Sequence, residues 1–352
     1  MTVGLENTHI GAEILHSHRA ALAQASVTLQ IALNSDLSEQ NRNRYAEDAE
    51  QHLDYLSAAI MTEQPALFDD YVNWARTLCI ANNVRLSELV FGLECLRDVL
   101  NERLAPEISQ IASTFIDHSL KTLDREPPRT PSFIQPGQPH AELAQRYLAA
   151  LLSQDRRSAS QVIHEAVQAG VDIKALYMDV FQPCQFEIGR LWHLNQVSIP
   201  QEHFCTAVTQ TLIGHMYQAI FTTPRNGRTA VVACVGGELH DLGARMVADF
   251  LEIDGWDTLY LGANTPPESI AQMAHQNHAD LLCISATISS HIREVIETIA
   301  AVREHFSRQG IAILVGGHPF RIAPDLWRQV GADGYAPDAQ SAAQMASMLI
   351  AL

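Results

Sequence analysis

From residue 228 onward, short β-branched runs alternate with helical stretches, and this rhythm constrains the fold more than any other feature of the chain. In order, the runs are TAVVACV, DTLYLG, ADLLCIS, IAILVGG and DGYA, each followed by a helical pattern. Such alternation is typical of a doubly wound parallel sheet with helices on both faces. Because ligands of these sheets bind beyond the carboxyl ends of the strands, we expect a ligand site in the loops that follow them.

The chain ahead of this sheet is helical in two segments that a proline-rich stretch separates. Residues 8–124 repeat apolar positions at three- and four-residue steps, as in Ile14, Leu15 and Leu22. The stretch REPPRTPSFIQPGQP predicts a linker, because its prolines favour extended backbone and lack an amide donor. The helical segment that follows has the length and the apolar faces of about four bundled helices.

These patterns predict a multidomain α and α/β protein. With 352 residues, 47% of them hydrophobic, the chain can bury more than one core. We expect an N-terminal all-helical, globin-like domain at 1–124, a linker at 125–139, a four-helix-bundle cap at 140–225 and a flavodoxin-like parallel sheet domain at 226–352.

Composition narrows the location and the partners of the chain. The formal net charge is −17 without any basic run, which argues against direct nucleic-acid binding. The sequence shows no apolar stretch of membrane-spanning length and no secretory signal, so we expect a cytoplasmic protein with no membrane contact. The six cysteines are scattered without a CxxC pair, which favours reduced core thiols.

The loop after the first predicted strand, GGELHDLG, holds His240 in the open rather than on a helix face. The loop lacks the GxGxxG of a dinucleotide site and the Gly-Lys-Ser/Thr of a Walker loop. A histidine two residues after a carboxylate, here Glu238, suits a metal ligand whose second ring nitrogen is held by that carboxylate or by a neighbouring hydroxyl. Taken alone, His240 is explained equally well as a metal ligand or as an ordinary loop residue.

Two later strands also end in small residues, which let a ligand approach the backbone closely. Ser285 and Thr287 close the third strand, and Gly316 and Gly317 close the fourth. ExHxxG, SxT and GG at successive strand ends resemble the base-off, His-on cobalamin-binding domain, whose pattern is (D/E)xHxxG, Sx(L/T), GG. The likeness covers about residues 140–350.

This resemblance implies a set of cofactor-binding residues. His240 would coordinate cobalt from below and displace the dimethylbenzimidazole tail of the cofactor, and Gly243 completes its motif. Either Glu238 or Ser285 would hold the other side of the imidazole. The slot for the displaced tail would be lined by Ser285, Thr287, Gly316 and Gly317.

A predicted helical hairpin precedes the sheet, with one helix ending near Trp192 and the next opening at Ser198. The hairpin gathers Trp192, His193, Glu202 and His203 at one end of the cap. Trp192, nine residues and then Glu202-His203 resemble the Wx9EH signature of the CarH-type cobalamin photoreceptors, where these residues surround the 5′-deoxyadenosyl group. In that family the histidine after the tryptophan, His193 here, becomes the upper cobalt ligand once light has cleaved the cobalt–carbon bond.

The N-terminal segment departs from that family, because it is acidic and helical where CarH-type repressors carry a basic DNA reader. Residues 68–100 loosely resemble globin-related helical domains, and photocobilin-type proteins pair a cobalamin domain with a bilin. This likeness implies a sensor or interaction domain for biliverdin or another tetrapyrrole. Burial habits nevertheless favour core or surface roles for His52, Tyr71 and Trp74. Apolar helical faces in this segment favour a homodimer.

These resemblances lead to a first functional hypothesis: the chain is a light-responsive signalling protein and not an enzyme. Photolysis of adenosylcobalamin would change cap, dimer or partner contacts, and the downstream protein is not indicated by the sequence. The alternative is a corrinoid methyl carrier of a methyltransferase system. A cobalamin subunit of a radical mutase is disfavoured, because the sequence offers no substrate barrel.

Overall fold

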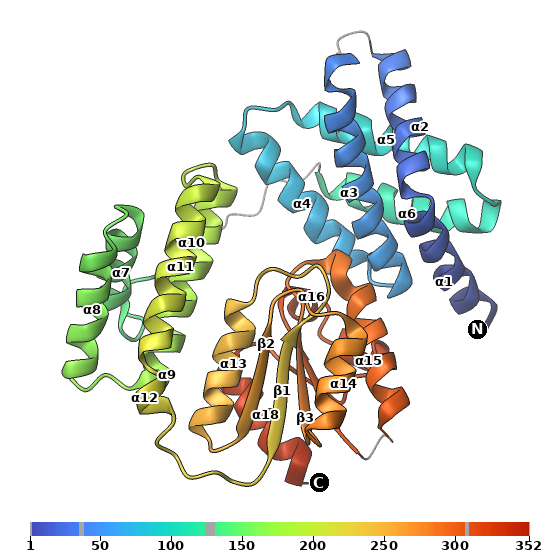
Figure 1. The fold of residues 1–352 in the computed structure, drawn as a ribbon. Helices are drawn as coiled ribbons and strands as arrows, with labels where there is room; N and C mark the ends of the chain where they lie inside the picture. The colour runs from blue at the N-terminus through green and yellow to red at the C-terminus, as the bar shows by residue number, and fades with distance from the viewer. Residues whose placement is uncertain (1, 35–38, 124–130, 307–309, 352) are drawn as a thin grey trace. The chain divides into compact units, whose positions relative to one another are not determined.

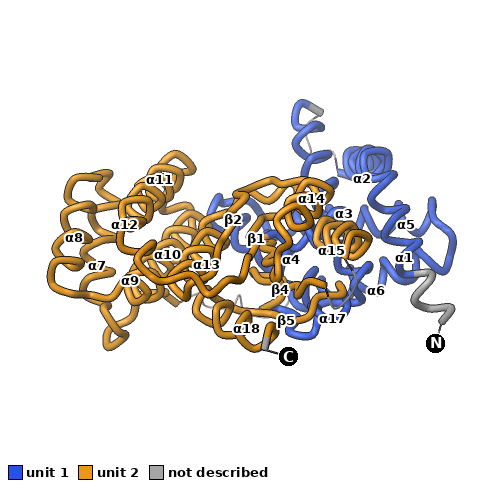
Figure 2. The backbone as a smooth tube through the Cα atoms, turned by 60° about the horizontal axis from the view of Figure 1, so that its bottom comes forward, with its two compact units in different colours: residues 1–128, 288–293, 322–329 blue, residues 129–287, 294–321, 330–352 orange. Residues whose placement is uncertain are grey.

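The computed structural model describes residues 2–34, 39–123, 131–306 and 310–351, and they form two compact units (Figure 2). The first unit comprises residues 1–128, 288–293 and 322–329, and the second comprises 129–287, 294–321 and 330–352. The predicted cap and sheet therefore belong to one unit. Residues 125–130 of the predicted linker lie outside the described residues.

The first unit is helical, as predicted. Pro65 and Pro106 open two of its helices, where the missing amide donor costs nothing because first-turn amides have no intrahelical partner. Leu53, Phe68 and Leu96 are fully buried in its core. Its main helices are α1 (Thr2–Ser17), α2 (Arg19–Leu33), α3 (Arg42–Met61), α4 (Pro65–Ala81), α5 (Leu86–Arg103) and α6 (Pro106–Leu123), with the short η1 (Glu39–Asn41) ahead of α3.

The cap is a bundle of four main helices with short connecting turns. These elements are α7 (Ala141–Leu152), α8 (Arg156–Gln168), α9 (Ile173–Ala175), η2 (Leu176–Phe181), α10 (Gln182–His193), α11 (Ile199–His215) and α12 (Tyr217–Ile220). The hairpin between α10 and α11 forms as predicted, and the backbone N–H of Ser198 donates to Gln201 Oε1 at 3.0 Å in a capping box. The element η2 is a π-helix that leads directly into α10, an irregularity that the sequence analysis did not predict.

The predicted parallel sheet has five strands in the order β2-β1-β3-β4-β5, which is the flavodoxin-like order. All strand pairs are parallel. The strands are β1 (Thr229–Cys234), β2 (Asp257–Gly262), β3 (Leu281–Ser285), β4 (Ala312–Gly316) and β5 (Gly334–Ala336). The inner strands β1, β3 and β4 are mostly buried, because helices cover both faces of the sheet.

The connecting helices divide between the two faces of the sheet (Figure 1). Helices α13 and α18 lie on one face, and α14 and α15 lie on the other. The elements are α13 (Leu242–Ile253), α14 (Pro267–Gln276), η3 (Ser289–His291), α15 (Ile292–His305), α16 (His318–Ile322), α17 (Leu326–Gln329) and α18 (Ala339–Ala351). None of the helices in the described ranges is long and apolar enough to span a membrane.

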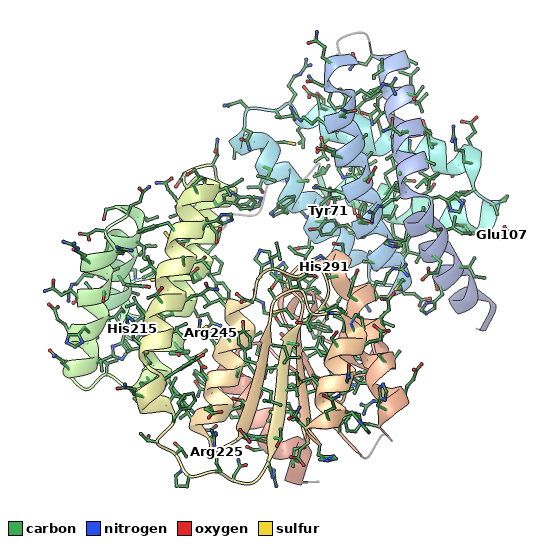
Figure 3. The ribbon with its side chains drawn as sticks, viewed as in Figure 1. Tyr71, Glu107, His215, Arg225, Arg245 and His291 are labelled. Atoms are coloured by element: carbon green, nitrogen blue, oxygen red, sulfur yellow. The ribbon has the colours of Figure 1, made fainter. Side chains whose placement is uncertain are left out.

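The cap docks along α13, and one apolar core runs from the cap into the α13 side of the sheet. Polar contacts follow the same helix. The guanidinium of Arg245 lies 5.4 Å from the centre of the Tyr217 ring, and Arg245 can be followed in Figure 3. One turn further along, the hydroxyl of Tyr177 donates to Asp249 Oδ2 at 2.8 Å. The cap is therefore fixed to the helix that begins immediately after the His240 loop.

Residues 131–139, the described part of the predicted linker, contact the cap. Ile134 is buried in the cap core. The backbone N–H of Phe133 donates to Glu187 Oε2 at 2.9 Å, and Glu187 is paired with Arg190. This short stretch of bends and turns thus packs on α10.

Candidate functional site

His240 lies in the loop between β1 and α13, at the carboxyl end of β1. The sheet order changes direction at β1, because β2 lies on one side of it and β3 on the other. Crevices at such topological switch points are the usual ligand sites of doubly wound sheets. The imidazole is 60% exposed at this edge of the sheet.

The carboxylate of Glu238 organises the loop around His240. Its Oε1 accepts hydrogen bonds from the backbone N–H of His240 at 2.9 Å and from the ring Nδ1 at 2.6 Å. Its Oε2 accepts from the backbone N–H of Thr287 at 2.6 Å, which ties the loop to the end of β3. Because a carboxylate only accepts, the Nδ1 of His240 carries the proton and Nε2 presents its lone pair.

The carboxylates around His240 also stabilise its imidazolium form, in which Nε2 carries a proton that a metal would have to displace. The pKa of His240 is raised, chiefly because Glu238 hydrogen-bonds the ring, with smaller contributions from the charges of Glu202 and Asp241. Glu202 belongs to cap helix α11, and its charge contributes to the raised pKa of His240. The charge of a predicted cap residue, Glu202, thus acts on the imidazole of the sheet domain.

Ser285 does not share the role of Glu238. The ring Nδ1 of His240 donates to Glu238 Oε1 at 2.6 Å, and the thiol of Cys234 donates to the backbone oxygen of His240 at 3.7 Å. Of the two candidates for holding the far side of His240, Glu238 is therefore the one in contact with the ring. Thr287 takes part through its backbone.

The predicted glycines differ in how much space a side chain would find at each position. Gly317 has φ +112°, and a Cβ there would lie 1.9 Å from the carbonyl oxygen of Ala286. A Cβ at Gly316 would lie 3.0 Å from the carbonyl oxygen of Ala336. The packing of neighbouring backbone therefore requires glycine at 317 and leaves little room for a side chain at 316, a reason not evident from the sequence. Around Gly243 a Cβ would meet nothing within 4 Å among the described residues.

The cap residues lie on two successive helices. Trp192 and His193 are in the last turn of α10, and Glu202 and His203 are in the first turn of α11. Trp192 is half-buried and packs against the shared core. His203 is 73% exposed, with its Nε2 3.6 Å from Glu202 Oε2. The predicted gathering of these residues at the α10–α11 hairpin is consistent with this arrangement.

Three further residues join the cap to the His240 loop, and sequence reasoning missed them. Asp241 Oδ1 accepts a hydrogen bond from Gln210 Nε2 on α11 at 3.0 Å. Its Oδ2 accepts from the hydroxyl of Tyr260 on β2 at 2.9 Å. The one available signal was the position of Asp241, directly after His240.

The aromatic residues singled out in the N-terminal segment lie in the core of the first unit. His52 Nδ1 and the hydroxyl of Tyr71 are 2.7 Å apart, and both side chains are buried. The Tyr55 ring stacks on Tyr71 with centroids 3.8 Å apart, and the centroid of the Trp74 ring lies 6.0 Å from that of Tyr71. Packing accounts for these contacts.

The loop fits a large, flat cofactor with a metal that takes nitrogen ligands. Among the described residues, His240 Nε2 has no hydrogen-bond partner, while Nδ1 is fixed by Glu238. Leu239, the preceding residue, is 72% exposed, although apolar side chains of this size are usually buried. The open space at Gly243 adjoins the same loop. An apolar ring lying on this surface would cover Leu239 and reach the free nitrogen.

Comparison with known families agrees with this fit. Residues 228–344 match the family model described as B12 binding domain, and residues 143–217 match a second model with the same description. The sheet domain and the cap therefore form a cobalamin-binding module, and the protein is a cobalamin-binding protein.

Relatives and solved structures place it beside the corrinoid proteins. Monomethylamine corrinoid protein 1 of Methanosarcina acetivorans is 24% identical over 211 residues, covering 58% of this chain and 96% of its own length. Dimethylamine corrinoid protein of Methanosarcina barkeri is 30% identical over 118 residues, covering 33% of this chain and 54% of its own. The structure of the Methanosarcina barkeri monomethylamine corrinoid protein, at 19% identity and a TM-score of 0.54, covers 60% of this chain and 99% of its own, which shows the shared fold. The likeness to CarH-type photoreceptors stays a prediction.

Proposed function

We propose that this chain is a corrinoid protein that carries a methyl group on cobalt between two partner proteins, with His240 as the lower ligand. The observation that carries the proposal is the imidazole of His240, held through Nδ1 by buried Glu238 and open at Nε2. The printed names of the relatives, which are methylamine corrinoid proteins, favour this function over light sensing. The chain itself would turn over no substrate.

In this proposal the bound cobalamin would supply a cobalt centre that takes up and gives up a methyl group. The chain controls how strongly the lower nitrogen donates. Glu238 accepts a hydrogen bond from the Nδ1–H of His240, which makes the ring more electron-rich at Nε2. Its further hydrogen bond from Thr287 holds the carboxylate in place, so the donor strength is fixed by the fold.

A second candidate function is light-responsive signalling, and one specific arrangement favours it. Trp192, His193, Glu202 and His203 meet at the α10–α11 hairpin, and the charge of Glu202 reaches His240. In this case adenosylcobalamin would supply a cobalt–carbon bond that visible light breaks. His193 would then approach the cobalt from the cap side, and the cap would change its contacts with a dimer partner or a downstream protein.

This second candidate extends to the N-terminal helices. A biliverdin or a related tetrapyrrole held there would act as a second chromophore beside the cobalamin. The aromatic cluster of His52, Tyr55, Tyr71 and Trp74 is the region where such a ring would lie, and binding would require that cluster to open.

One experiment separates the two functions. The protein is loaded with adenosylcobalamin, and its absorption spectrum and its oligomeric state are recorded before and after green light, with and without biliverdin. A carrier keeps its oligomeric state, and its methylcobalamin form passes the methyl group to a thiol when a cobalamin-dependent methyltransferase is added. A sensor converts irreversibly to a spectrum typical of two nitrogen ligands and changes its assembly.

The variant His193→Ala sharpens the comparison, with His164→Ala on the exposed face of α8 as the matched control. Loss of the light-induced spectrum in His193→Ala alone supports sensing. Methyl transfer that is equal in both variants and in the parent, with no light product that has two nitrogen ligands, supports the carrier. Light conversion coupled to a change in assembly would overturn the carrier proposal.

A further inference from the structure

The residue that follows His240 connects the loop to the cap. Asp241 Oδ1 accepts a hydrogen bond from the Gln210 side chain at 3.0 Å, and Gln210 belongs to cap helix α11. Asp241 Oδ2 accepts from the Tyr260 hydroxyl at 2.9 Å, and the same hydroxyl is 3.2 Å from the Asp241 backbone oxygen. One carboxylate thus joins three elements at the end of the sheet.

Asp241 makes these contacts at the expense of its ordinary role. It is the N-cap residue of α13, a position where an aspartate usually accepts a hydrogen bond from the second or third backbone N–H of the helix. Here the side chain makes no such bond, and its backbone has φ −91° and ψ −14° instead of the extended conformation typical of an N-cap. Both carboxylate oxygens are directed to Gln210 and Tyr260 instead.

Gln210 lies on the same cap helix as Glu202, and its contact with Asp241 fixes that helix relative to the His240 loop. Glu202 lies eight residues earlier on the same helix, which corresponds to a rise of about 12 Å. Because Gln210 contacts the residue beside His240, it determines how far above the loop the first turn of α11 lies.

Other polar contacts between the cap and α13 among the described residues lie further along that helix. Arg245 contacts Tyr217, Asp249 accepts from Tyr177, and Asp254, just beyond the helix, pairs with Lys174 at 2.5 Å. The contact between Gln210 and Asp241 is nearer in sequence to His240 than any of these three contacts. It is therefore the contact that fixes the position of the cap relative to the His240 loop.

We propose that Gln210 is a positioning residue: through Asp241, it sets the placement of the His240 loop relative to the cap and so the strength of the lower-ligand bond. This inference rests on the proposed role of His240 as lower ligand and applies to methyl transfer and light sensing alike. It assigns no chemistry to Gln210.

The test exchanges donor and acceptor across the contact. Gln210→Glu places two carboxylates together, while the double variant Gln210→Glu with Asp241→Asn restores a hydrogen bond of opposite polarity. In that double variant the asparagine amide donates to residue 210 and its oxygen still accepts from Tyr260. Thr211→Glu adds the same charge on the exposed side of α11 and is the matched control.

Each variant is loaded with cob(II)alamin, and the fraction of cobalt that shows nitrogen hyperfine splitting is measured by electron paramagnetic resonance. For Gln210→Glu we expect this fraction to fall at least about twofold and the dissociation constant to rise about tenfold. The double variant should return both values to within about twofold of the parent. Thr211→Glu should change neither value.

Hydrogen exchange of the cofactor-free protein gives an independent measure. We expect faster exchange of the amides at 236–243 in Gln210→Glu and recovery in the double variant, while exchange in the core of α13 stays slow and confirms folding. Unchanged nitrogen splitting in folded Gln210→Glu, or a double variant as impaired as the single, overturns the proposal. If the parent protein itself shows no nitrogen splitting, the role of His240 fails instead, which distinguishes the two.

Discussion

The carboxylate of Glu238 holds His240 at two points, the backbone N–H and the ring Nδ1, with one oxygen. Its other oxygen accepts from Thr287 at the end of the next strand. A buried group with these partners fixes both the loop and the tautomer of the imidazole.

We predict that Glu238→Gln lowers the pKa of His240 and destabilises the second unit by about 1–3 kcal/mol. A neutral amide no longer stabilises the imidazolium, and its NH2 group meets the N–H of Thr287, which leaves a buried donor without an acceptor. Nuclear magnetic resonance titration of His240 in the cofactor-free protein and thermal unfolding would measure the two effects. An unchanged titration would contradict the assignment of Glu238 as the partner of the ring.

His240→Ala should weaken cobalamin binding by about a hundredfold, because the loop loses the ring nitrogen that it presents to cobalt. The control is His164→Ala, which removes an exposed imidazole of the cap. Isothermal titration with hydroxocobalamin measures both dissociation constants. Equal affinity in the two variants would rule out His240 as the lower ligand.

Two glycines of the cofactor motifs should respond in opposite ways to alanine. At Gly317, the positive φ and the carbonyl of Ala286 leave no room for a Cβ, so Gly317→Ala should cost about 3 kcal/mol or more of unfolding free energy. Gly243 lies in the first turn of α13 with open space around it, so Gly243→Ala should leave stability unchanged or raise it by up to about 1 kcal/mol. Urea unfolding of both variants gives the comparison, and a larger loss at Gly243 would contradict it.

The buried pair of Asp249 and Tyr177 predicts a pH dependence of the second unit. Burial raises the pKa of Asp249 from 3.8 to about 6, so the folded state binds this proton more tightly than the unfolded state. The corresponding stabilisation is complete below pH 3.8 and is lost as the pH rises through about 6. Asp249→Asn keeps an acceptor for Tyr177 without the buried charge, so its stability relative to the parent should increase by about 2 kcal/mol between pH 4 and pH 7. Hydrogen exchange of α13 amides measures this difference, and a constant offset across the range would refute it.

His52 predicts the opposite slope in the first unit. Burial lowers its pKa from 6.5 to about 4, so the folded state excludes a proton that the unfolded state binds. The associated stability is present above pH 6.5 and disappears as the pH falls through about 4. His52→Gln retains a polar partner for Tyr71 and should flatten this acid sensitivity, which exchange of α3 amides would detect. A slope equal to that of the parent would show that other groups control it.

Periodicity in the sequence predicts the strands and the hairpin because their determinants are local. The run from Ala230 to Cys234 is apolar and buried throughout, as a strand covered on both faces must be. Ser198 and Gln201 form a capping box that can be recognised from their spacing alone. The need for Gly317, by contrast, comes from the carbonyl of Ala286, just beyond the end of β3, which no local pattern reveals.

The hydrogen-bond partners of Asp241 could not be predicted from the sequence either. Its position before a helix predicts capping by its side chain, and only the packed structure shows that Gln210 and Tyr260 compete successfully for the carboxylate. Glu238 was one of two candidates, and the choice between it and Ser285 required the hydrogen bond that joins Glu238 to the His240 ring.

The π-helical turn from Leu176 to Phe181 leads directly into α10. It therefore determines the direction in which each side chain of α10 points around the helix axis. Each residue added to or removed from a helix turns the remainder of that helix by about 100° about the axis. Tyr177, within this turn, is hydrogen-bonded to Asp249 on α13. The directions of Trp192 and His193 around the axis of α10 therefore depend on the number of residues between them and Tyr177. A one-residue deletion in this turn would leave the composition of the cap almost intact and still rotate both rings out of register with the sheet domain.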